Sequence, residues 1–400
     1  MLNAFSTALS TLSANELGID VAGNNLANLN TPGYKATALN FSEMMAQTSA
    51  NGATQVGMGV GTPTTRRIST EGPLQPNSGP LTAAIQGDGF FMVQDANSQT
   101  LYTRDGNFKL DSQGNLLTQS GAEVLGINGP IQVPTNNLAP TETTAMTLDL
   151  NLDASSTTGT TFSQPIQVVD SLGASHMLTV TFTKTGTGAW SMTGSCDATG
   201  STVTVSGTTS LAFDATGKLT TTPSAATPPV NATIAISGLP NGASAMSIGW
   251  DFFADDNKTP RITQNAGTST SSAQYQNGSV PASLSGVSIG DGGFVVATYD
   301  NGKTLNVGQL QLANFRNPDT LVDVGNNEYK TSGLTSAPSI GVAGTGGRGT
   351  VVGGSLEGSN VDIATEFSNL IVYQRGYEAG TRVITTADQL TQDTINLIRE

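Results

Sequence analysis

The chain has 400 residues, enough for more than one domain, and only 12% of them are charged, about half the usual share of about 25%. The formal net charge is −14, and the 16 Lys and Arg residues are scattered, with Arg66-Arg67 as their one adjacent pair. Nucleic acids and anionic membranes are bound by clustered basic residues, so this composition argues against both kinds of partner.

The chain has one Cys, Cys196, and one His, His176, which limits its chemistry. A single Cys cannot form a disulfide within the chain. His176 has no second His and no Cys close to it in the sequence, which disfavours a metal site. We find no nucleophile–base pattern and no phosphate-binding loop either. We therefore predict no enzyme activity, no cofactor and no metal.

The sequence contains no stretch close to the about 20 consecutive apolar residues that a membrane-spanning helix needs. Membrane insertion is therefore not expected. The first residues also lack the charged region and the continuous apolar region of a secretory leader. If the protein leaves the cell, we expect a route that does not cleave such a leader.

Both ends of the chain carry an apolar pattern that predicts a helix. In each, apolar residues recur in alternating steps of three and four, which is the heptad spacing of coiled coils. The residues of the N-terminal stripe are Leu2, Phe5, Leu9, Leu12, Ile19 and Leu26. Those of the longer C-terminal stripe are Ile363, Phe367, Leu370, Tyr377, Ile384, Ile395 and Ile398, with Leu390 on a second stripe beside it.

Polar residues interrupt these stripes at Glu16, Gln374 and Asp388, which would weaken an isolated pair of helices. One interpretation is a helical hairpin that packs on its own domain. The other is that the helices bury apolar sides against neighbouring copies of the chain, so that the stripe residues are assembly residues. Two stripes on the C-terminal helix favour the second interpretation, because one can meet the N-terminal helix and the other a second subunit.

Between the helices, short β-type segments alternate with turns. Gly87-Asp88-Gly89 separates two apolar segments, and Asp111–Asn115 predicts a turn between two strands. Asp105-Gly106-Asn107 lies between Leu101–Arg104 and Phe108–Leu110. Because Asp-Gly favours the positive φ of a tight turn, we predict a hairpin there.

A second Gly-Asp-Gly unit, at 290–292, lies on the other side of the middle of the chain. This indicates one β-domain built from two separated segments, 81–146 and 285–344, with a second domain inserted at 147–284. The insert is rich in short β-branched segments and in turns such as Asp170–Gly173, which predicts a sandwich or flattened barrel. The predicted fold is mainly β, with two nested β-rich domains and terminal α-helices.

Two longer motifs near the ends resemble those of flagellar rod and hook proteins. Residues 24–35, NNLANLNTPGYK, resemble the signature near the N-terminus of that family. Residues 356–362, LEGSNVD, followed by 374–378, QRGYE, resemble its shared C-terminal motif. The motif residues are Asn24, Asn25, Asn28, Asn30, Thr31, Pro32, Gly33, Tyr34, Asn360, Val361, Asp362, Gln374 and Arg375. Physically, Pro32 stops a helix while Asn and Gly allow a turn, so the first motif should end the N-terminal helix.

The inserted domain distinguishes hook from rod within this family. Distal-rod proteins resemble the chain in the β-domain around residues 87–108 but are shorter and lack a large insert. Segments 168–173 and 308–315 resemble hook proteins. Gly376 and Gly380, inside the predicted C-terminal helix, depart from an ideal helix, because each glycine costs about 1 kcal/mol against Ala.

The resemblance implies a subunit of the bacterial flagellar hook, outside the cell. Such subunits are exported through the flagellar type III apparatus and polymerise with themselves into a curved, flexible tube that transmits torque from rod to filament. Implied partners are the hook cap protein, the distal rod protein and the hook-filament junction protein. Residues 1–30 and 360–400 would line the inner tube, 31–80 and 345–359 would be extended linkers, and the two β-domains would form outer layers.

Two other functions stay open from the sequence. A distal-rod protein of the same family would form a straight, rigid shaft instead of a curved tube. A secreted β-rich fibre protein or adhesin would fit the central domain but would leave the terminal motifs unexplained.

Overall fold

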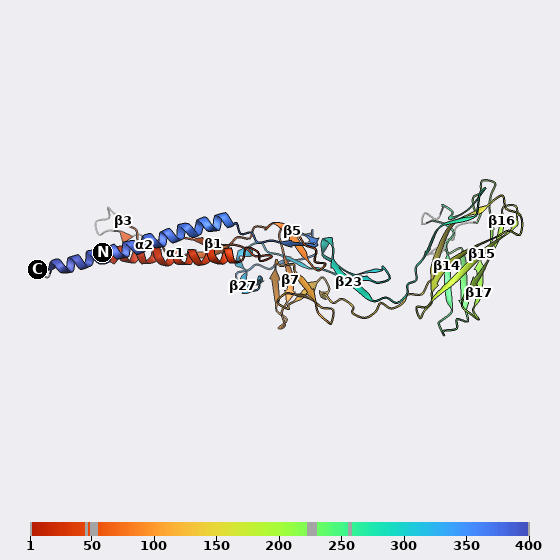
Figure 1. Cartoon of the computed structure of the whole chain (residues 1–400), viewed down its shortest axis with the longest axis horizontal. Helices are drawn as coiled ribbons and strands as arrows, with labels where there is room; N and C mark the ends of the chain where they lie inside the picture. Colours follow the sequence, from red (N-terminus) through yellow and green to blue (C-terminus); the bar gives the residue numbers. More distant parts are fainter. Residues whose placement is uncertain (1, 45–46, 49–54, 222–229, 255–257, 399–400) are drawn as a thin grey trace. The chain divides into compact units, whose positions relative to one another are not determined.

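The computed structural model describes residues 2–44, 47–48, 55–221, 230–254 and 258–398. It contains two compact units (Figure 1). Unit 1 comprises residues 1–135, 286–298 and 304–400, and unit 2 comprises residues 136–285 and 299–303. Unit 2 is therefore inserted into the sequence of unit 1.

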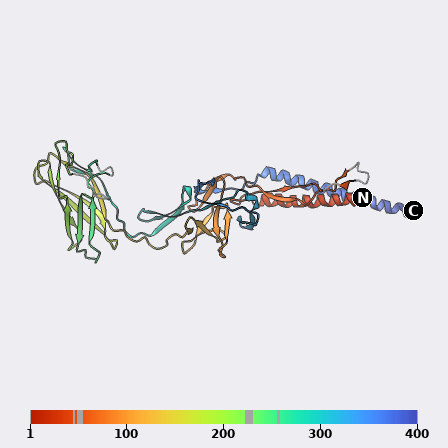
Figure 2. The ribbon, with the colours of Figure 1, turned by 180° about the vertical axis from the view of Figure 1, so that it is seen from behind.

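The two terminal helices belong to unit 1. They are α1 (Leu2–Ala27) and α2 (Ile363–Ile398), and they run side by side in both views (Figures 1 and 2). Close approaches of Gly18 to Tyr373 and of Gly380 to Leu12 show that they are antiparallel. Asp362 starts α2, because its Oδ1 accepts a hydrogen bond from the Thr365 N–H at 2.7 Å. This hydrogen bond holds the pKa of Asp362 below its usual value. The predicted terminal helices are confirmed.

The main sheet of unit 1 joins strands from both sides of the insertion. Phe91 pairs with Leu312, and Tyr102 pairs with Tyr329. The sheet order is β27 (Val322–Gly325), β28 (Glu328–Lys330), β8 (Thr100–Thr103), β7 (Phe90–Gln94), β11 (Glu123–Gly126), β10 (Leu116–Thr118) and β9 (Phe108–Leu110), with β12 (Gly129–Pro130), β26 (Leu312–Asn314) and β29 (Ser339–Gly341) attached. Phe90, Tyr102, Phe315 and Tyr329 form its aromatic core.

Shorter ladders connect this sheet with the helices. Two of them pair segments that lie far apart in the sequence, since Leu356 pairs with Gln75 and Val351 with Ile85. The pairs are β1 (Thr37–Asn40) with β4 (Thr64–Arg67), β2 (Gln47–Thr48) with β3 (Gln55–Val56), β5 (Leu74–Pro76) with β31 (Ser355–Glu357), and β6 (Ala83–Gln86) with β30 (Thr350–Gly353). A three-stranded sheet contains β23 (Leu284–Ile289), β24 (Phe294–Tyr299) and β25 (Thr304–Gln309), and the 3-10 turns are η1 (Asp291–Gly293) and η2 (Pro318–Thr320).

The hairpin predicted at Asp105-Gly106-Asn107 is wrong. The strand before it, β8, pairs with β7 and β28, whereas the strand after it, β9, pairs with β10. Gly106 has no positive φ, and a Cβ on it would lie 1.6 Å from the Ala83 carbonyl oxygen. The glycine therefore permits a close approach of two backbones instead of a tight turn. The neighbouring prediction is confirmed, because Gly114 has a φ of 87° in the β9–β10 hairpin.

Unit 2 is a sandwich of two sheets. One has the order β17 (Thr202–Gly207), β19 (Ala232–Ser237), β20 (Met246–Trp250), β13 (Ala145–Asp153) and β21 (Ile262–Asn265), with β22 (Thr270–Gln276) paired to β13. The other has the order β14 (Thr161–Val169), β15 (Ser175–Gly186), β16 (Ala189–Cys196) and β18 (Ser210–Ala212). Alternate residues of these strands point into a shared core that holds Phe182, Trp190 and Trp250, all fully buried. The predicted sandwich and the Asp170–Gly173 hairpin turn are confirmed.

Candidate assembly surface

The contact between α1 and α2 includes close approaches at glycines of both helices. On α1, Gly18 lies between the buried Ala14 and Ala22. A Cβ on Gly18 would lie 2.8 Å from the Tyr373 ring. On α2, a Cβ on Gly376 would lie 2.6 Å from the Asn15 side chain. The glycines that looked unfavourable in the sequence therefore allow the two helices to approach closely.

The predicted apolar stripes lie largely outside this contact. The exposed residues of the stripes are Phe5, Leu9, Ile363, Phe367, Tyr377, Leu390 and Ile395. The half-buried ones are Leu12, Ile19, Leu26, Leu370 and Ile384. The side chains of Leu2 and Ile398 lie outside the described residues. The helix pair thus leaves apolar side chains exposed on both helices, and exposed apolar surface of this kind is common where proteins contact one another.

Sequence reasoning missed the most exposed large apolar side chain among the described side chains of α2. Val372 is 64% exposed, and its neighbour Ile371 is 50% exposed. Both fall between the stripe positions Leu370 and Gln374, so a search limited to heptad spacing passes over them. The signal that could have found them is the continuous apolar run Leu370-Ile371-Val372-Tyr373, which is too wide for one stripe.

The two family motifs meet where the helices join the β-strands. Asn25, only 1% exposed, is the centre of this junction. Its Nδ2 donates to the Thr37 carbonyl oxygen at 2.8 Å and to Glu366 Oε1 of α2 at 3.1 Å. Its Oδ1 accepts from the Thr37 N–H at 2.9 Å and from the Tyr34 hydroxyl at 3.1 Å. Burial raises the pKa of Tyr34. One amide thereby fixes the end of α1 to β1 and to α2.

The rest of the N-terminal motif forms the turn that ends α1, as predicted. Asn28 Nδ2 donates to Asn24 Oδ1 at 3.1 Å, and Thr31 Oγ1 donates to Asn28 Oδ1 at 3.1 Å. Gly33 has a φ of 70°, and a Cβ there would lie 2.7 Å from the Asp105 nitrogen. The Pro32 carbonyl oxygen accepts from Asn327 Nδ2 at 2.9 Å, while Asn30 is exposed.

The C-terminal motif supplies a second hydrogen-bonded amide, the half-buried Asn360. Asn360 Oδ1 accepts from the Ala36 N–H at 2.7 Å, and its Nδ2 donates to the Ile68 carbonyl oxygen at 2.8 Å. Val361 is buried beside it, 8% exposed. Gln374 and Arg375 instead lie exposed on α2. The first half of this motif therefore belongs to the junction and the second half to the outer side of the helix.

A buried ion cluster lies next to the two amides. Glu357, 1% exposed, accepts from Lys35 Nζ at 2.5 Å through Oε1 and from an Arg104 nitrogen at 3.1 Å through Oε2. Burial lowers the pKa of Lys35, and the nearby Glu357 opposes this effect. The cluster joins both motifs to β8, because Arg104 directly follows that strand. Lys35 and Glu357 both lie inside the motifs, but the sequence alone assigns them no role.

Comparisons with known proteins agree with this arrangement of the ends. Four family models match: "Flagella basal body rod protein" over residues 5–35, "Flagellar hook protein FlgE/F/G D1 domain" over 84–153, "Flagellar basal body protein FlaE D2 domain" over 137–279, and "Flagellar basal body rod FlgEFG protein C-terminal" over 352–397. The flagellar hook protein FlgE of Escherichia coli K12 is 32% identical over 423 residues, which cover 98% of this chain and 100% of that protein. The chain belongs to the flagellar hook protein family.

Hook proteins of other bacteria match over similar lengths. FlgE of Rhizobium meliloti is 33% identical and covers 98% of both chains, and FlgE of Treponema pallidum is 27% identical over 100% of both. The crystal structure of Helicobacter pylori FlgE2 matches with a TM-score of 0.51 at 13% identity, over 70% of this chain and 99% of that one, which supports the fold alone. The hook-family protein is a structural subunit of the bacterial flagellar hook, so the predicted family and location are confirmed.

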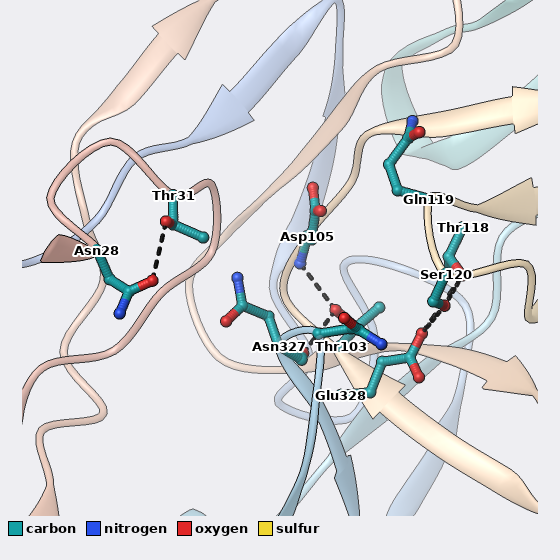
Figure 3. Close-up of a pocket in the computed structure, with 10 residues that line it drawn as sticks. Asn28, Thr31, Thr103, Asp105, Thr118, Gln119, Ser120, Asn327 and Glu328 are labelled. Atoms are coloured by element: carbon teal, nitrogen blue, oxygen red, sulfur yellow. Dashed lines mark hydrogen bonds between the residues drawn. The ribbon is translucent and has the colours of Figure 1, made fainter. Parts of the chain in front are cut away.

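The hook-family protein has a polar pocket beside the junction, of about 460 Å³ (Figure 3). Asn28 and Thr31 of the motif lie on one side, and Ser120 and Glu328 lie on the other. Ser120 Oγ donates to Glu328 Oε1, and the Asp105 N–H donates to Thr103 Oγ1 at 3.0 Å. Burial raises the pKa of Asp105. Most polar groups drawn there are already engaged with one another, so the pocket is a structural feature of the junction.

One group of side chains in the described part of the chain could hold a metal ion. It consists of His176, Cys196 and Asp197, in unit 2. The sequence disfavours a metal because His176 and Cys196 are 20 positions apart, but the hairpin β15–β16 brings them together. Among the described residues, no helix has the length and apolar character needed to cross a membrane.

Proposed function

We propose that this hook-family protein polymerises with itself through the uncovered apolar sides of α1 and α2. The observation that supports this most concerns the packing of the two helices. They approach each other closely at glycines, yet Leu9, Val372 and Leu390 stay between 54% and 64% exposed. Burying a large apolar side chain contributes about 1.5–3 kcal/mol. Several such side chains per subunit, repeated along a tube, favour assembly strongly.

The roles of the parts follow from the same proposal. The terminal segments 1–30 and 360–400 form the inner tube, and 31–80 with 345–359 link it outward. The β-domains, 81–146 with 285–344 and the inserted 147–284, form outer layers. The curved, flexible tube transmits torque from rod to filament. Its role is mechanical and not catalytic, with no cofactor. The two amides and the buried ion cluster of the junction support it, because they fix the helix pair to the first β-domain.

The partners follow from the position of the chain in the hook. Self-contacts are heterologous, so that each subunit presents one surface to the next and the assembly continues as a helix instead of closing. We propose contacts with the distal rod protein at one end and with the hook-filament junction protein at the other. The hook cap protein covers the growing tip, and the flagellar type III export apparatus delivers the chain. These partners rest on the family resemblance.

Electron microscopy of the purified chain tests the proposal. The full-length protein should form curved tubes, whereas a chain without residues 1–30 and 360–400 should stay monomeric. Leu9→Asp and Leu390→Asp should abolish tubes, because each places a charge in a buried contact. Leu334→Asp is the matched control: Leu334 is 87% exposed in unit 1 and belongs to neither helix, and its variant should form tubes. Tubes from the truncated chain, or from both helix variants, would refute the role of the helices.

A further inference from the structure

A cluster of potential metal ligands lies at one end of the four-stranded sheet of unit 2. Cys196 is the last residue of β16 and pairs with Leu178 of β15. His176 is two residues before Leu178, so it lies on the same face of the sheet as Cys196. That face is the core side, since Leu178 is fully buried and Cys196 packs against the core. His176 and Cys196 therefore sit together at the rim of an apolar core.

A buried carboxylate orients the ring of His176. Asp170, fully buried at the end of the β14–β15 hairpin, has its Oδ2 3.0 Å from His176 Nε2. Asp170 Oδ1 accepts two backbone hydrogen bonds, from Leu172 and Ala174, and Oδ2 also accepts from Asn241 Nδ2. Because the carboxylate accepts in all these bonds, the neutral ring carries its proton on Nε2. The lone pair of Nδ1 is then directed away from Asp170. Histidines that bind metals commonly donate their other ring N–H to a carboxylate that does not itself bind the metal.

Two further ligand groups lie near the ring of His176. Asp197 Oδ1 is 4.0 Å from His176 Nδ1 and 3.6 Å from Cys196 Sγ, and one ligand atom from each of the three residues lies within 4.8 Å of the others. A tetrahedral Zn²⁺ with N, S and O ligands at about 2.0–2.3 Å needs ligand atoms about 3.3–3.8 Å apart. The two ligand atoms that lie farthest apart would have to approach each other by about 1 Å to reach this geometry. Asp197 is exposed and follows the end of β16, and its Oδ1 accepts a hydrogen bond from the Met177 N–H at 2.9 Å, which holds the carboxylate near His176.

We propose that His176 Nδ1, Cys196 Sγ and the Asp197 carboxylate bind one Zn²⁺, with a water molecule as the fourth ligand. A thiolate with an imidazole selects zinc and similar transition metals over Mg²⁺ and Ca²⁺, which prefer oxygen ligands. On binding, the thiol of Cys196 loses its proton to solvent. The ion ties β15 to the residues that follow β16 and so stabilises the end of the sandwich. This site is independent of the proposed self-assembly.

Cobalt spectroscopy tests the site, because the chain has a single Cys and a single His. Co²⁺ added to the full-length monomer, kept below its assembly concentration, should give a thiolate-to-metal charge-transfer band that saturates at one equivalent. That band can arise from Cys196 alone. Zn²⁺ should displace Co²⁺ and remove the band. No charge-transfer band at excess Co²⁺ would overturn the proposal.

Competition with a chromophoric chelator measures Zn²⁺ affinity and assigns the ligands. Cys196→Ser and Asp197→Asn should each weaken binding at least tenfold. Asp153→Asn is the matched control, because Asp153 also ends a strand of unit 2 and accepts a backbone hydrogen bond, and its affinity should be unchanged. Equal Zn²⁺ affinity of the wild type and Cys196→Ser would overturn the site.

A measurement on the wild type covers the case in which a variant does not fold. Bound Zn²⁺ should slow the reaction of Cys196 with a maleimide at least tenfold, and a chelator should restore the rate. An unchanged rate at saturating Zn²⁺ would also overturn the proposal.

Discussion

Asn25 donates a hydrogen bond to Glu366 across 341 positions of sequence, with 3.1 Å between Nδ2 and Oε1. This contact joins the last turn of α1 to the first turn of α2, and Asn25 also fixes Thr37 and Tyr34. The ends of the chain are thereby held together at the point where the β-strands begin. The hook subunit thus combines a fixed junction with exposed helix faces beyond it.

Asn25→Ala should destabilise the helix pair by about 3 kcal/mol, because it leaves several buried polar groups without partners. Urea unfolding separates the two units, since far-UV circular dichroism reports α1 and α2 while both tryptophans, Trp190 and Trp250, lie in unit 2. The helix transition should shift to lower urea and the tryptophan transition should stay. Asn30→Ala, at an exposed position of the same motif, is the control and should change stability by less than about 0.5 kcal/mol. Equal shifts in both variants would argue against the junction.

Glu357→Ala should cost about 3–5 kcal/mol, because it leaves Lys35 and Arg104 as buried, uncompensated cations. The loss should again appear in the helix and β signal of unit 1 and not in tryptophan fluorescence. Asp323→Asn is the control. The Asp323 side chain is 58% exposed, and its Oδ2 lies 3.9 Å from Arg67 Nη2. The expected loss of stability is therefore under about 1 kcal/mol. A cost of Glu357→Ala as small as that of the control would show that the cluster is not a stabilising element.

Replacing either of two glycines of α1 with alanine should change the stability of the fold, in opposite directions for the two positions. None of the described residues lies within 4 Å of the place that a methyl group on Gly23 would take, so Gly23→Ala should stabilise the monomer by about 1 kcal/mol through helix propensity. Gly18→Ala should destabilise it despite the same gain, because its Cβ would lie 2.8 Å from the Tyr373 ring. Thermal unfolding by circular dichroism measures both. Stabilisation by Gly18→Ala would mean that the helices do not approach as closely as the structure shows.

Asp170 should make unit 2 sensitive to acid. Burial acts to raise its pKa, but hydrogen bonds from Asn241, His176, Ala174 and Leu172 outweigh it and lower the pKa to about 2. A carboxyl group with a lowered folded pKa stabilises the fold above its unfolded pKa, and this stabilisation is lost as the pH falls through the folded pKa. The stability gap between the wild type and Asp170→Asn should therefore be full above about pH 4.

That gap should shrink by about 2 kcal/mol as the pH falls from about 4 to 2. Urea unfolding followed by tryptophan fluorescence, with a chelator present, measures it. Asp214→Asn, at an exposed turn of unit 2, should show a smaller change in the same direction, because hydrogen bonds from Thr216 and Lys218 also lower the pKa of Asp214. A gap for Asp170→Asn that is constant between pH 7 and 2 would show that the buried carboxylate does not titrate as described.

The sequence predicted the terminal helices, the nested sandwich and the family, because periodicity and turn residues are local signals. It did not predict the packing of α1 on α2. Heptad spacing directs attention to large apolar residues such as Leu9 and Phe367, whereas the closest approaches of the two helices are at Gly18, Gly376 and Gly380. Small residues carry little hydrophobic signal, so their role becomes visible only when the partner helix is present.

The sequence also did not predict contacts between parts of the chain that lie far apart in it. The motif showed that Asn25 matters but not that it bonds Glu366, and Asp105-Gly106 has the composition of a hairpin turn although its strands pair elsewhere. His176 and Cys196 were judged by their separation in sequence, while strand register decides their separation in space. In each case the missing information is which strand or helix lies next to which.

Hydroxyl-radical footprinting of monomer and assembled hook tests the central claim most directly, namely that the exposed helix faces are the assembly surface. Leu9, Phe367 and Leu390, between 47% and 55% exposed in the single chain, should become strongly protected in the polymer. Trp190 and Trp250, buried in the monomer, are the internal reference and should not change. If these three helix residues react equally in monomer and polymer, the subunits assemble through another surface.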